Sequence, residues 1–348
     1  MTGNTLGWVI VAFVLYLLMM IAIGAFYAKG NNNSEDYFLG GRKLNGFVAA
    51  LSAQASDMSG WLLMGLPGAI YLTGVGGDGW IAIGLFIGTT LNWLFIATKL
   101  RRYTIRANNS VTLPTYFENR FHDEKKVLMA VSSITIVVFF LVYCASALSA
   151  GGQLFESVFG IDYHVALTIG ALVVLVYTFL GGFTAVCVTD FIQGMLMLVG
   201  ILAVPLFAYH FLTGNGTTLA AGLEASGADS ANFLNLMKNG DGSNNIISVI
   251  SGLGWGLGYF GMPHILLRFM AIEDEKKLVL SRRIASVWVV IAMTASIVIG
   301  MVGLGMTKAG ALEFLSGSSS ETLIVRIASL IAQHGVLAAV LAGLILAG

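Results

Sequence analysis

Charged residues and cysteines are scarce in this chain of 348 residues, and no long stretch of water-soluble composition is present. Apolar residues make up 57% and charged residues only 10%, so we expect an all-α polytopic membrane protein with no separate soluble domain. Eighteen basic residues balance eighteen acidic ones, which gives no argument for nucleic acid as a partner. Cys144 and Cys187 both lie in apolar runs, and a disulfide framework is therefore not expected.

Apolar runs long enough to cross a hydrocarbon core of roughly 30 Å recur along the chain. They predict spans near residues 7–28, 45–72, 79–99, 127–151, 163–181, 184–212, 245–268 and 282–307, with a ninth beginning near 335. The first run has no basic residue before it and no cleavage site after it, which favours a retained helix over a signal peptide. Segment 321–333 is short and amphipathic, typical of a helix at the interface. The last residues read as the middle of a span, so we expect a chain truncated within the ninth helix.

The basic residues are concentrated in three loops. Loops 29–44, 99–126 and 268–283 hold fifteen of the eighteen lysines and arginines. Basic loops stay in the cytoplasm. We therefore predict a multi-pass protein of the cell membrane with its N-terminus outside, and an external loop over residues 213–244.

Two aspartates, Asp57 and Asp190, lie inside predicted spans. A charge at the bilayer centre costs about 2.5–3.5 kcal/mol on insertion scales, so each acid needs a partner or a water-filled cavity. The helix around Asp57 is also weak, because Ser56, Ser59 and Gly60 are poor interior residues and Pro67 removes a backbone hydrogen bond. Unwinding near residues 55–60 would free carbonyl oxygens that suit a small hard cation. The alternative is a packing contact of Asp57 with another helix.

A second span, residues 251–270, is interrupted by a cluster of glycines and then by Pro263. Trp255, Tyr259 and Met262 are spaced i, i+4, i+7 and should share one face, where they could line a pocket for a small solute. The same glycines have the four-residue spacing of ordinary close packing between membrane helices, and this reading remains open.

The two interrupted spans are the second and the seventh, five apart. Interrupted spans at corresponding positions of two halves indicate the substrate site of a secondary transporter. We therefore expect one transporter domain over residues 1–348. It would consist of an extra helix at 7–28, a first inverted repeat at 45–212 and part of a second repeat at 245–348.

Four stretches carry a resemblance to a known family: "YFLGGRKLNGFVAALSAQASDMSGWLLMGLPGA", "TLPTYFENRF", "YCASALSAGGQLFES" and "GWGLGYFGMPHILLRFMA". They resemble the sodium/solute symporter family, and most closely its sodium/proline symporter branch. The resemblance implies a LeuT-type core of two inverted five-helix repeats after one extra helix. It also implies a membrane transporter, not an enzyme, whose partners are Na⁺, a small amino acid such as proline, and the bilayer.

The resemblance further implies roles for individual residues. The backbone oxygens of Ala55 and Met58 would bind sodium, with Asp57 and Ser59 close by and Asp190 on the passage of sodium to the cytoplasm. Solute contacts would come from Tyr143, Trp255, Tyr259, Met262 and Pro263. Arg42 would act in coupling, although a basic anchor of the cytoplasmic loop explains it equally well. Proline carriers commonly have Gln where this chain has Met262, which leaves the solute open.

Other functions remain as alternatives. Two intramembrane aspartates are the catalytic residues of an aspartyl intramembrane protease. However, neither "ASDMSG" nor "CVTDFIQ" has the Gly-x-Gly-Asp-like context of such enzymes. A sensor or receptor of transporter-like fold, a channel, and a symporter of the same family for another solute fit the same residues. Sodium-coupled uptake of a small amino acid by alternating access is the function that the sequence favours.

Overall fold

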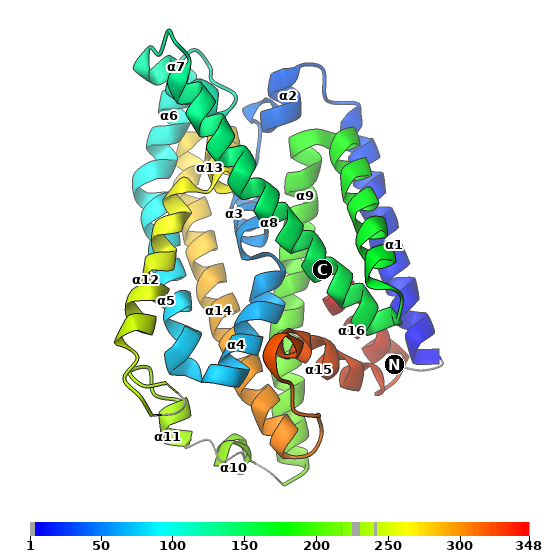
Figure 1. Cartoon of the computed structure of the whole chain (residues 1–348). Coiled ribbons are helices and arrows are strands. Elements are labelled where there is room, and N and C mark those ends of the chain that lie inside the picture. The colour runs from blue at the N-terminus through cyan, green and yellow to red at the C-terminus, as the bar shows by residue number, and fades with distance from the viewer. Residues whose placement is uncertain (1–3, 217, 225–229, 240–241, 348) are drawn as a thin grey trace.

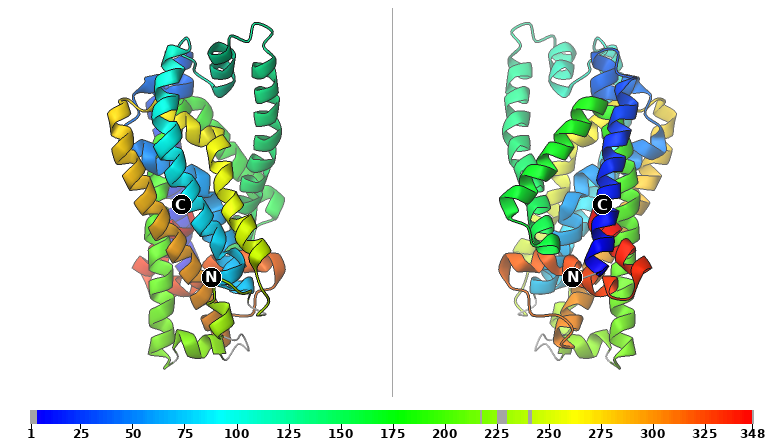
Figure 2. Two further views of the ribbon diagram at one scale, coloured as in Figure 1. Left: turned by 90° about the vertical axis from the view of Figure 1, so that its left-hand side faces the viewer. Right: turned by 90° about the vertical axis from the view of Figure 1, so that its right-hand side faces the viewer.

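The computed structural model describes residues 4–216, 218–224, 230–239 and 242–347. Every regular element among these residues is a helix, and the β-structure is limited to two isolated bridges. Most of the long helices run roughly along one direction of the molecule (Figure 2), and in the view of Figure 1 α8 crosses the others obliquely. The predicted all-α class is confirmed.

The helices follow one another along the chain with short connections. The first half contains α1 (Asn4–Ala28), α2 (Ser34–Leu39), η1 (Gly40–Arg42), α3 (Gly46–Gly60), η2 (Trp61–Gly65), α4 (Leu66–Thr73), α5 (Val75–Asn92), η3 (Trp93–Ala97), α6 (Thr98–Arg106), α7 (Leu113–Phe121) and α8 (Val127–Phe159). The second half contains α9 (Tyr163–Gly214), α10 (Leu219–Glu224), α11 (Ser230–Phe233), α12 (Ile246–Gly258), η4 (Tyr259–Gly261), α13 (Pro263–Ala271), η5 (Glu275–Lys277), α14 (Leu278–Lys308), η6 (Gly317–Thr322), α15 (Leu323–Ala332) and α16 (Val336–Ala347).

Five helical segments are long and apolar enough to cross a membrane, and a sixth results if the bent pair α12–α13 counts as one span. The five are Thr5–Ala28, Val75–Arg106, Val127–Phe159, Tyr163–Gly214 and Glu275–Lys308. Among the described residues this number is lower than the nine predicted spans because α9 contains two of them, the second and seventh are interrupted, and α16 is short. The multi-pass membrane character is confirmed.

The helix α9 and the helical path that begins with α5 test two predicted boundaries. The predicted spans 163–181 and 184–212 are the two helical legs of α9, which meet at the kink at Gly182 (φ 61°, ψ −158°), so this boundary is confirmed. Only glycine adopts this conformation readily, so the break occurs where the sequence supplies it. The helical path that begins with α5 also continues through η3 and α6 to Arg106, so the basic residues 99–106 extend a helix instead of forming a loop.

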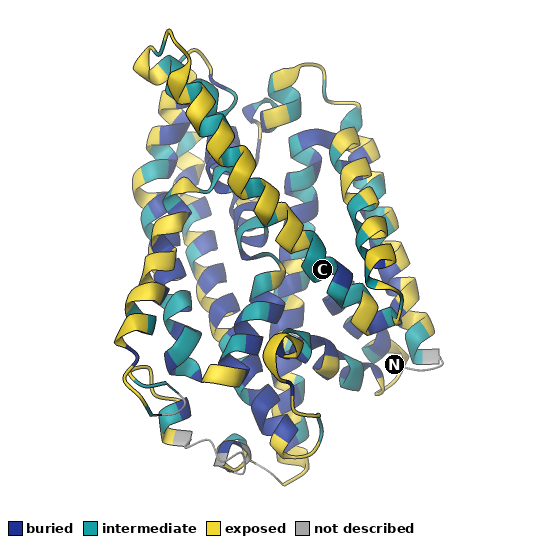
Figure 3. Cartoon of the chain, in the orientation of Figure 1, coloured by how far each residue is buried: buried dark blue, intermediate teal, exposed yellow. Residues whose placement is uncertain are grey.

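Burial differs sharply between the central and peripheral helices. In the most apolar stretch of 18 residues within Glu275–Lys308, the segment that contains α14, 61% of the residues are buried within the protein. In the corresponding stretch of α8, no residue is buried. Figure 3 shows the same contrast, with α8 mostly exposed. A helix that is apolar all round and exposed within a soluble protein would aggregate, whereas in a bilayer its surface meets lipid.

The three basic loops gather at one end of the molecule. Figure 1 shows α2, α6 and α7 at this end, with α10 and α11 at the opposite end. Arg42 ties the loops together, because its guanidinium donates to the carbonyl oxygens of Met270 (2.8 Å) and Ser110 (2.9 Å) and to Asn109 Oδ1 (3.0 Å). Burial lowers the pKa of Arg42, while the nearby Glu35 opposes this shift.

Candidate functional site

The first interrupted helix changes direction at a single residue. Ser59, in α3, has φ 47° and ψ −161°, far from helical values, and the five-residue π-helix η2 follows immediately. The N–H of Trp61 donates to the carbonyl oxygen of Met58 across the break. The predicted interruption near 55–60 is confirmed, but it is narrower than predicted. A non-glycine residue with positive φ is strained, and such positions cluster at functional sites.

The second interrupted helix breaks where the glycines end and the proline begins. Helix α12 passes into the 3₁₀ turn η4, and then Met262 is extended (φ −74°, ψ 105°). Pro263 opens α13, where its missing N–H and fixed φ suit the first helical position. The axes of the two segments differ by 46°, as the sequence predicts.

The glycines of α12 serve two purposes on two faces. A Cβ atom at Gly252 would lie 2.7 Å from the Cβ of Trp80 in α5, and one at Gly256 would lie 2.2 Å from the carbonyl oxygen of Gly84. Gly254 and Gly258 have open space around them and line a cavity. Close packing is therefore confirmed for Gly252 and Gly256, whereas Gly254 and Gly258 face a cavity.

A cavity of about 560 Å³, here called the outer cavity, lies between the two breaks. Trp255, Tyr259 and Met262 line it together, which confirms that they share a face. The rings of Trp255 and Trp61 stack with centroids 5.5 Å apart. The hydroxyl of the buried Tyr259 donates to Gln54 Oε1 at 3.2 Å. Aromatic walls with a few fixed polar groups are typical of small-solute pockets.

Asp57 lines the outer cavity together with Met58 and Ser59. No ion pair to Asp57 occurs in the part of the chain that the structure describes. Tyr143 crosses from α8 to the break, where its hydroxyl donates to the carbonyl oxygen of Ser56 at 2.7 Å. The acid is thus held next to the break without a basic partner.

Asp190, the other intramembrane acid, has a basic partner. Its Oδ2 accepts hydrogen bonds from Arg268 Nη2 (2.7 Å), Ser52 Oγ (2.7 Å) and Ser56 Oγ (2.8 Å). Arg268 is 4% exposed and Asp190 7%. The predicted place of Arg268 in a cytoplasmic loop is wrong, because the arginine lies inside α13 and is buried, with hydrogen bonds to Ser52 of α3 and Asp190 of α9.

A second cavity of about 610 Å³, here called the inner cavity, adjoins the ion pair. It is lined by residues of α3, α8, α9 and α13 that include Ala55, Ser56, Asp190, His264 and Arg268. The outer and inner cavities share Ser59 and Tyr143 in their walls. The break in α3 therefore lies where the two cavities meet.

Two predicted site residues lie elsewhere. Pro263 lines a separate cavity of about 430 Å³ with Phe38 and Leu267, away from the outer cavity. Arg42 lies in η1 with the loop contacts described above and lines neither the outer nor the inner cavity.

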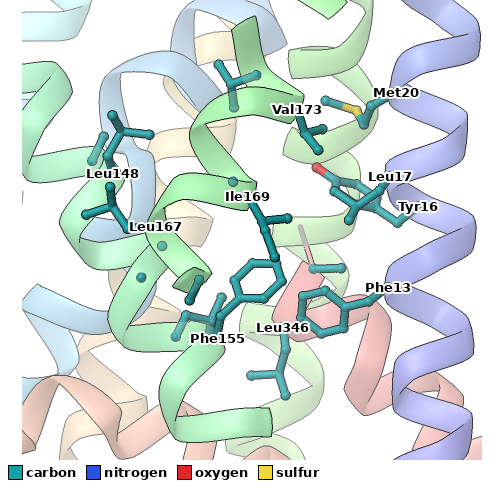
Figure 4. A pocket seen from close by; sticks show the side chains of 18 of the residues that line it. Phe13, Tyr16, Leu17, Met20, Leu148, Phe155, Leu167, Ile169, Val173 and Leu346 are labelled. Atoms are coloured by element: carbon teal, nitrogen blue, oxygen red, sulfur yellow. The ribbon is translucent and has the colours of Figure 1, made fainter. Parts of the chain in front are cut away.

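A further pocket of about 200 Å³ differs in character. Figure 4 shows Phe13, Leu17 and Met20 of α1 around a space that α8 and α9 close with apolar side chains such as Phe155 and Val173. Such walls offer little to an ion or a zwitterion.

Arg268 and His264 are two residues of this region that were not predicted to belong to the site. Both follow Pro263 within one and a half turns of α13. Their spacing of four residues puts them on one face of α13, and this was the only signal in the sequence.

Comparison with known proteins supports a single family. The family model described as "Sodium:solute symporter family" matches residues 37–348. The chain is 42% identical over 323 residues to the sodium/proline symporter of Salmonella typhimurium, covering 92% of this chain and 62% of that protein. It is 44% identical over 295 residues to the sodium/proline symporter of Escherichia coli, covering 85% and 57%, and 46% identical over 285 residues to the high-affinity proline transporter PutP of Bacillus subtilis, covering 82% and 58%.

The fold is also that of a known transporter. A substrate-bound, outward-open structure of a Na⁺-coupled sialic acid symporter aligns with a TM-score of 0.78 at 18% identity, covering 98% of this chain and 70% of that one. The chain spans about three fifths of the length of the curated relatives it matches. From the family match and these relatives, the chain belongs to the sodium:solute symporter family.

Proposed function

We propose that this protein is a secondary active transporter that couples inward movement of Na⁺ to uptake of a small amino acid, with proline as the first candidate. The observation that carries the proposal is the break at Ser59, with the unpaired acid Asp57 beside it at the wall of the outer cavity. The sodium/proline symporters among the relatives support the choice of ion and solute.

In this proposal Na⁺ binds at the break. The backbone oxygens of Ala55 and Met58 are ligands, and the Asp57 carboxylate and Ser59 hydroxyl lie near the ion, since hard cations prefer oxygen ligands. Asp190 accepts the ion later, on its way to the cytoplasm. The residues present fit such an ion, because carboxylate, hydroxyl and carbonyl oxygens meet at one change of backbone direction.

The solute occupies the outer cavity. Tyr143, Trp255, Tyr259 and Met262 form its walls, and Pro263 contributes by ending the helix at the break. Met262 makes the pocket less polar than an amide would, which favours a solute with an apolar ring or side chain.

The architecture in this proposal is an inverted repeat. Residues 7–28 form the extra helix, 45–212 the first repeat and 245–348 part of the second, so that each repeat contributes one interrupted helix. The basic loops face the cytoplasm and the N-terminus lies outside. Arg42 couples the loops of this end to α13, where it binds the carbonyl oxygen of Met270.

One sodium ion supplies enough free energy for uptake. Moving a positive charge down about 100 mV yields roughly 2.3 kcal/mol, and a tenfold sodium gradient adds about 1.4 kcal/mol. Together these correspond to a concentration ratio of a few hundredfold for the solute. Coupling requires that solute and sodium each tighten the binding of the other.

The test is uptake of labelled proline into vesicles that contain the full-length protein. We expect uptake with an inward sodium gradient that clearly exceeds uptake with a potassium or a proton gradient of the same size. Equal uptake under all three gradients would exclude sodium coupling. Binding of proline without uptake under any gradient would favour a sensor instead.

A further inference from the structure

The inner cavity contains one polar side chain whose hydrogen-bonding atoms have no partner. Both ring nitrogens of His264 are buried, and neither forms a hydrogen bond within the described residues. The other buried side-chain atoms of the described chain that have no partner belong to residues that do not line the inner cavity. Leaving a buried donor or acceptor unsatisfied is costly, so this imidazole requires an explanation.

The polar groups beside His264 are already engaged. Arg268 donates to Ser52 Oγ (3.0 Å), to Ser56 Oγ (2.8 Å), to Asp190 and to the carbonyl oxygen of His264 itself (2.6 Å). The hydroxyl of Tyr143 is bound to the backbone of Ser56. The His264 ring, which belongs to the wall of the inner cavity, therefore has hydrogen-bonding capacity that no group of the described chain uses.

The position of the ring connects it to the outer cavity. The imidazole stacks on Tyr143 with centroids 5.6 Å apart and an interplanar angle of 21°, and Phe140 packs edge-on at 5.4 Å. Tyr143 belongs to the walls of both cavities. The His264 ring is therefore in contact with a residue of the wall that the two cavities share, and the Arg268–Asp190 pair lines the same inner cavity.

The chemistry of the ring selects the ligand. A neutral imidazole carries one N–H donor and one bare nitrogen acceptor, whereas Na⁺ prefers oxygen. The donor suits a carboxylate, which is also favoured at the N-terminal end of α13, where His264 is the second residue. The bare nitrogen is left for a different donor, because the two ring nitrogens point away from each other and cannot both bind the adjacent carboxylate and ammonium groups of one amino acid.

We propose that His264 is a solute-contact residue of the inner cavity, and that it binds the carboxylate of a zwitterionic amino acid on its way from the outer cavity. The assignment rests on the proposed transport function. In this proposal the inner cavity is a second binding site for the solute, and His264 helps to select solutes that have a carboxylate.

The experiment compares His264→Phe, which keeps an aromatic ring, with His264→Gln, which keeps a donor and an acceptor. We expect His264→Phe to raise the proline concentration for half-maximal uptake by roughly ten- to a hundredfold, because a hydrogen bond to a charged group is lost. His264→Gln should stay within about threefold of the wild type. His210→Phe, at an exposed position of α9, is the matched control and should change nothing.

A second measurement separates solute contact from packing. Prolinamide, which lacks the carboxylate, competes with labelled proline in the same vesicles. The wild type should favour proline over prolinamide strongly, and His264→Phe should lose about tenfold of this preference while its sodium requirement stays unchanged. An unchanged preference, or equal damage in His264→Phe and His264→Gln, would overturn the assignment. Absence of sodium-driven proline uptake by the wild type would instead refute the proposed function.

Discussion

The two intramembrane acids have opposite environments. Asp190 is bound by a guanidinium and two serine hydroxyls, whereas Asp57 lines a cavity and has no ion pair within the described chain. A buried charge needs compensation. Asp190 receives it from the protein itself, whereas Asp57 needs it from outside. In the proposed function Asp57 is therefore the acid that meets the cation, whereas Asp190 binds Arg268 and links α3, α9 and α13.

Among the variants that test this comparison, loss of the Arg268 side chain should lower the stability of the protein most. Arg268→Gln leaves Asp190 buried without a counter-charge, and we expect the free energy of unfolding to fall by about 3–5 kcal/mol. The measurement is the midpoint of thermal unfolding in detergent. Arg102→Gln removes an exposed ion pair with Glu275 and is the control, with an expected loss below about 1 kcal/mol.

The double variant Arg268→Gln with Asp190→Asn sharpens this result. It removes both charges, so it should recover a large part of the lost stability. If Arg268→Gln alone unfolds like the wild type, the ion pair does not hold the helices together and the contrast between the two acids fails.

Loss of the Ser52 hydroxyl, which binds Asp190, should cause the next largest loss of stability. Ser52→Ala removes a donor to the carboxylate and an acceptor for Arg268 Nε, and we expect a loss of roughly 1.5–3 kcal/mol because the partners are charged. Ser132→Ala on α8, whose hydroxyl binds only its own helix, is the matched control. Equal unfolding midpoints for the two variants would contradict a shared network around Asp190.

Substitution of Asp57, the acid at the break, should weaken sodium binding without lowering the stability of the protein. Asp57→Asn should raise the sodium concentration for half-maximal uptake roughly tenfold or more, about 1.4 kcal/mol, because a charge next to the ion is removed. Its unfolding midpoint should stay the same or rise, since an uncompensated carboxylate is lost. Glu124→Gln in an exposed loop is the control. An unchanged sodium requirement would remove Asp57 from the ion site.

Residues that act through local sequence were predictable. The serines around Asp57 and the glycines before Pro263 weaken a helix by their own conformational preferences, so both interruptions could be predicted before any contact was known. The face shared by Trp255, Tyr259 and Met262 follows from helical periodicity alone. The π-helix after Ser59 was not predicted, because no residue preference within the segment specifies it.

The amino-acid sequence by itself determined the membrane-spanning character, the two interrupted helices, the end at which the basic loops gather and the family. Each of these depends on composition or on spacing within one helix. The tertiary structure decided that Arg268 pairs with Asp190 and that alternate glycines of α12 face a helix or a cavity. It also decided that the ring nitrogens of His264 have no hydrogen-bond partner among the described residues. These contacts join segments far apart in the chain, and periodicity within one helix carries no information about which partner another helix presents.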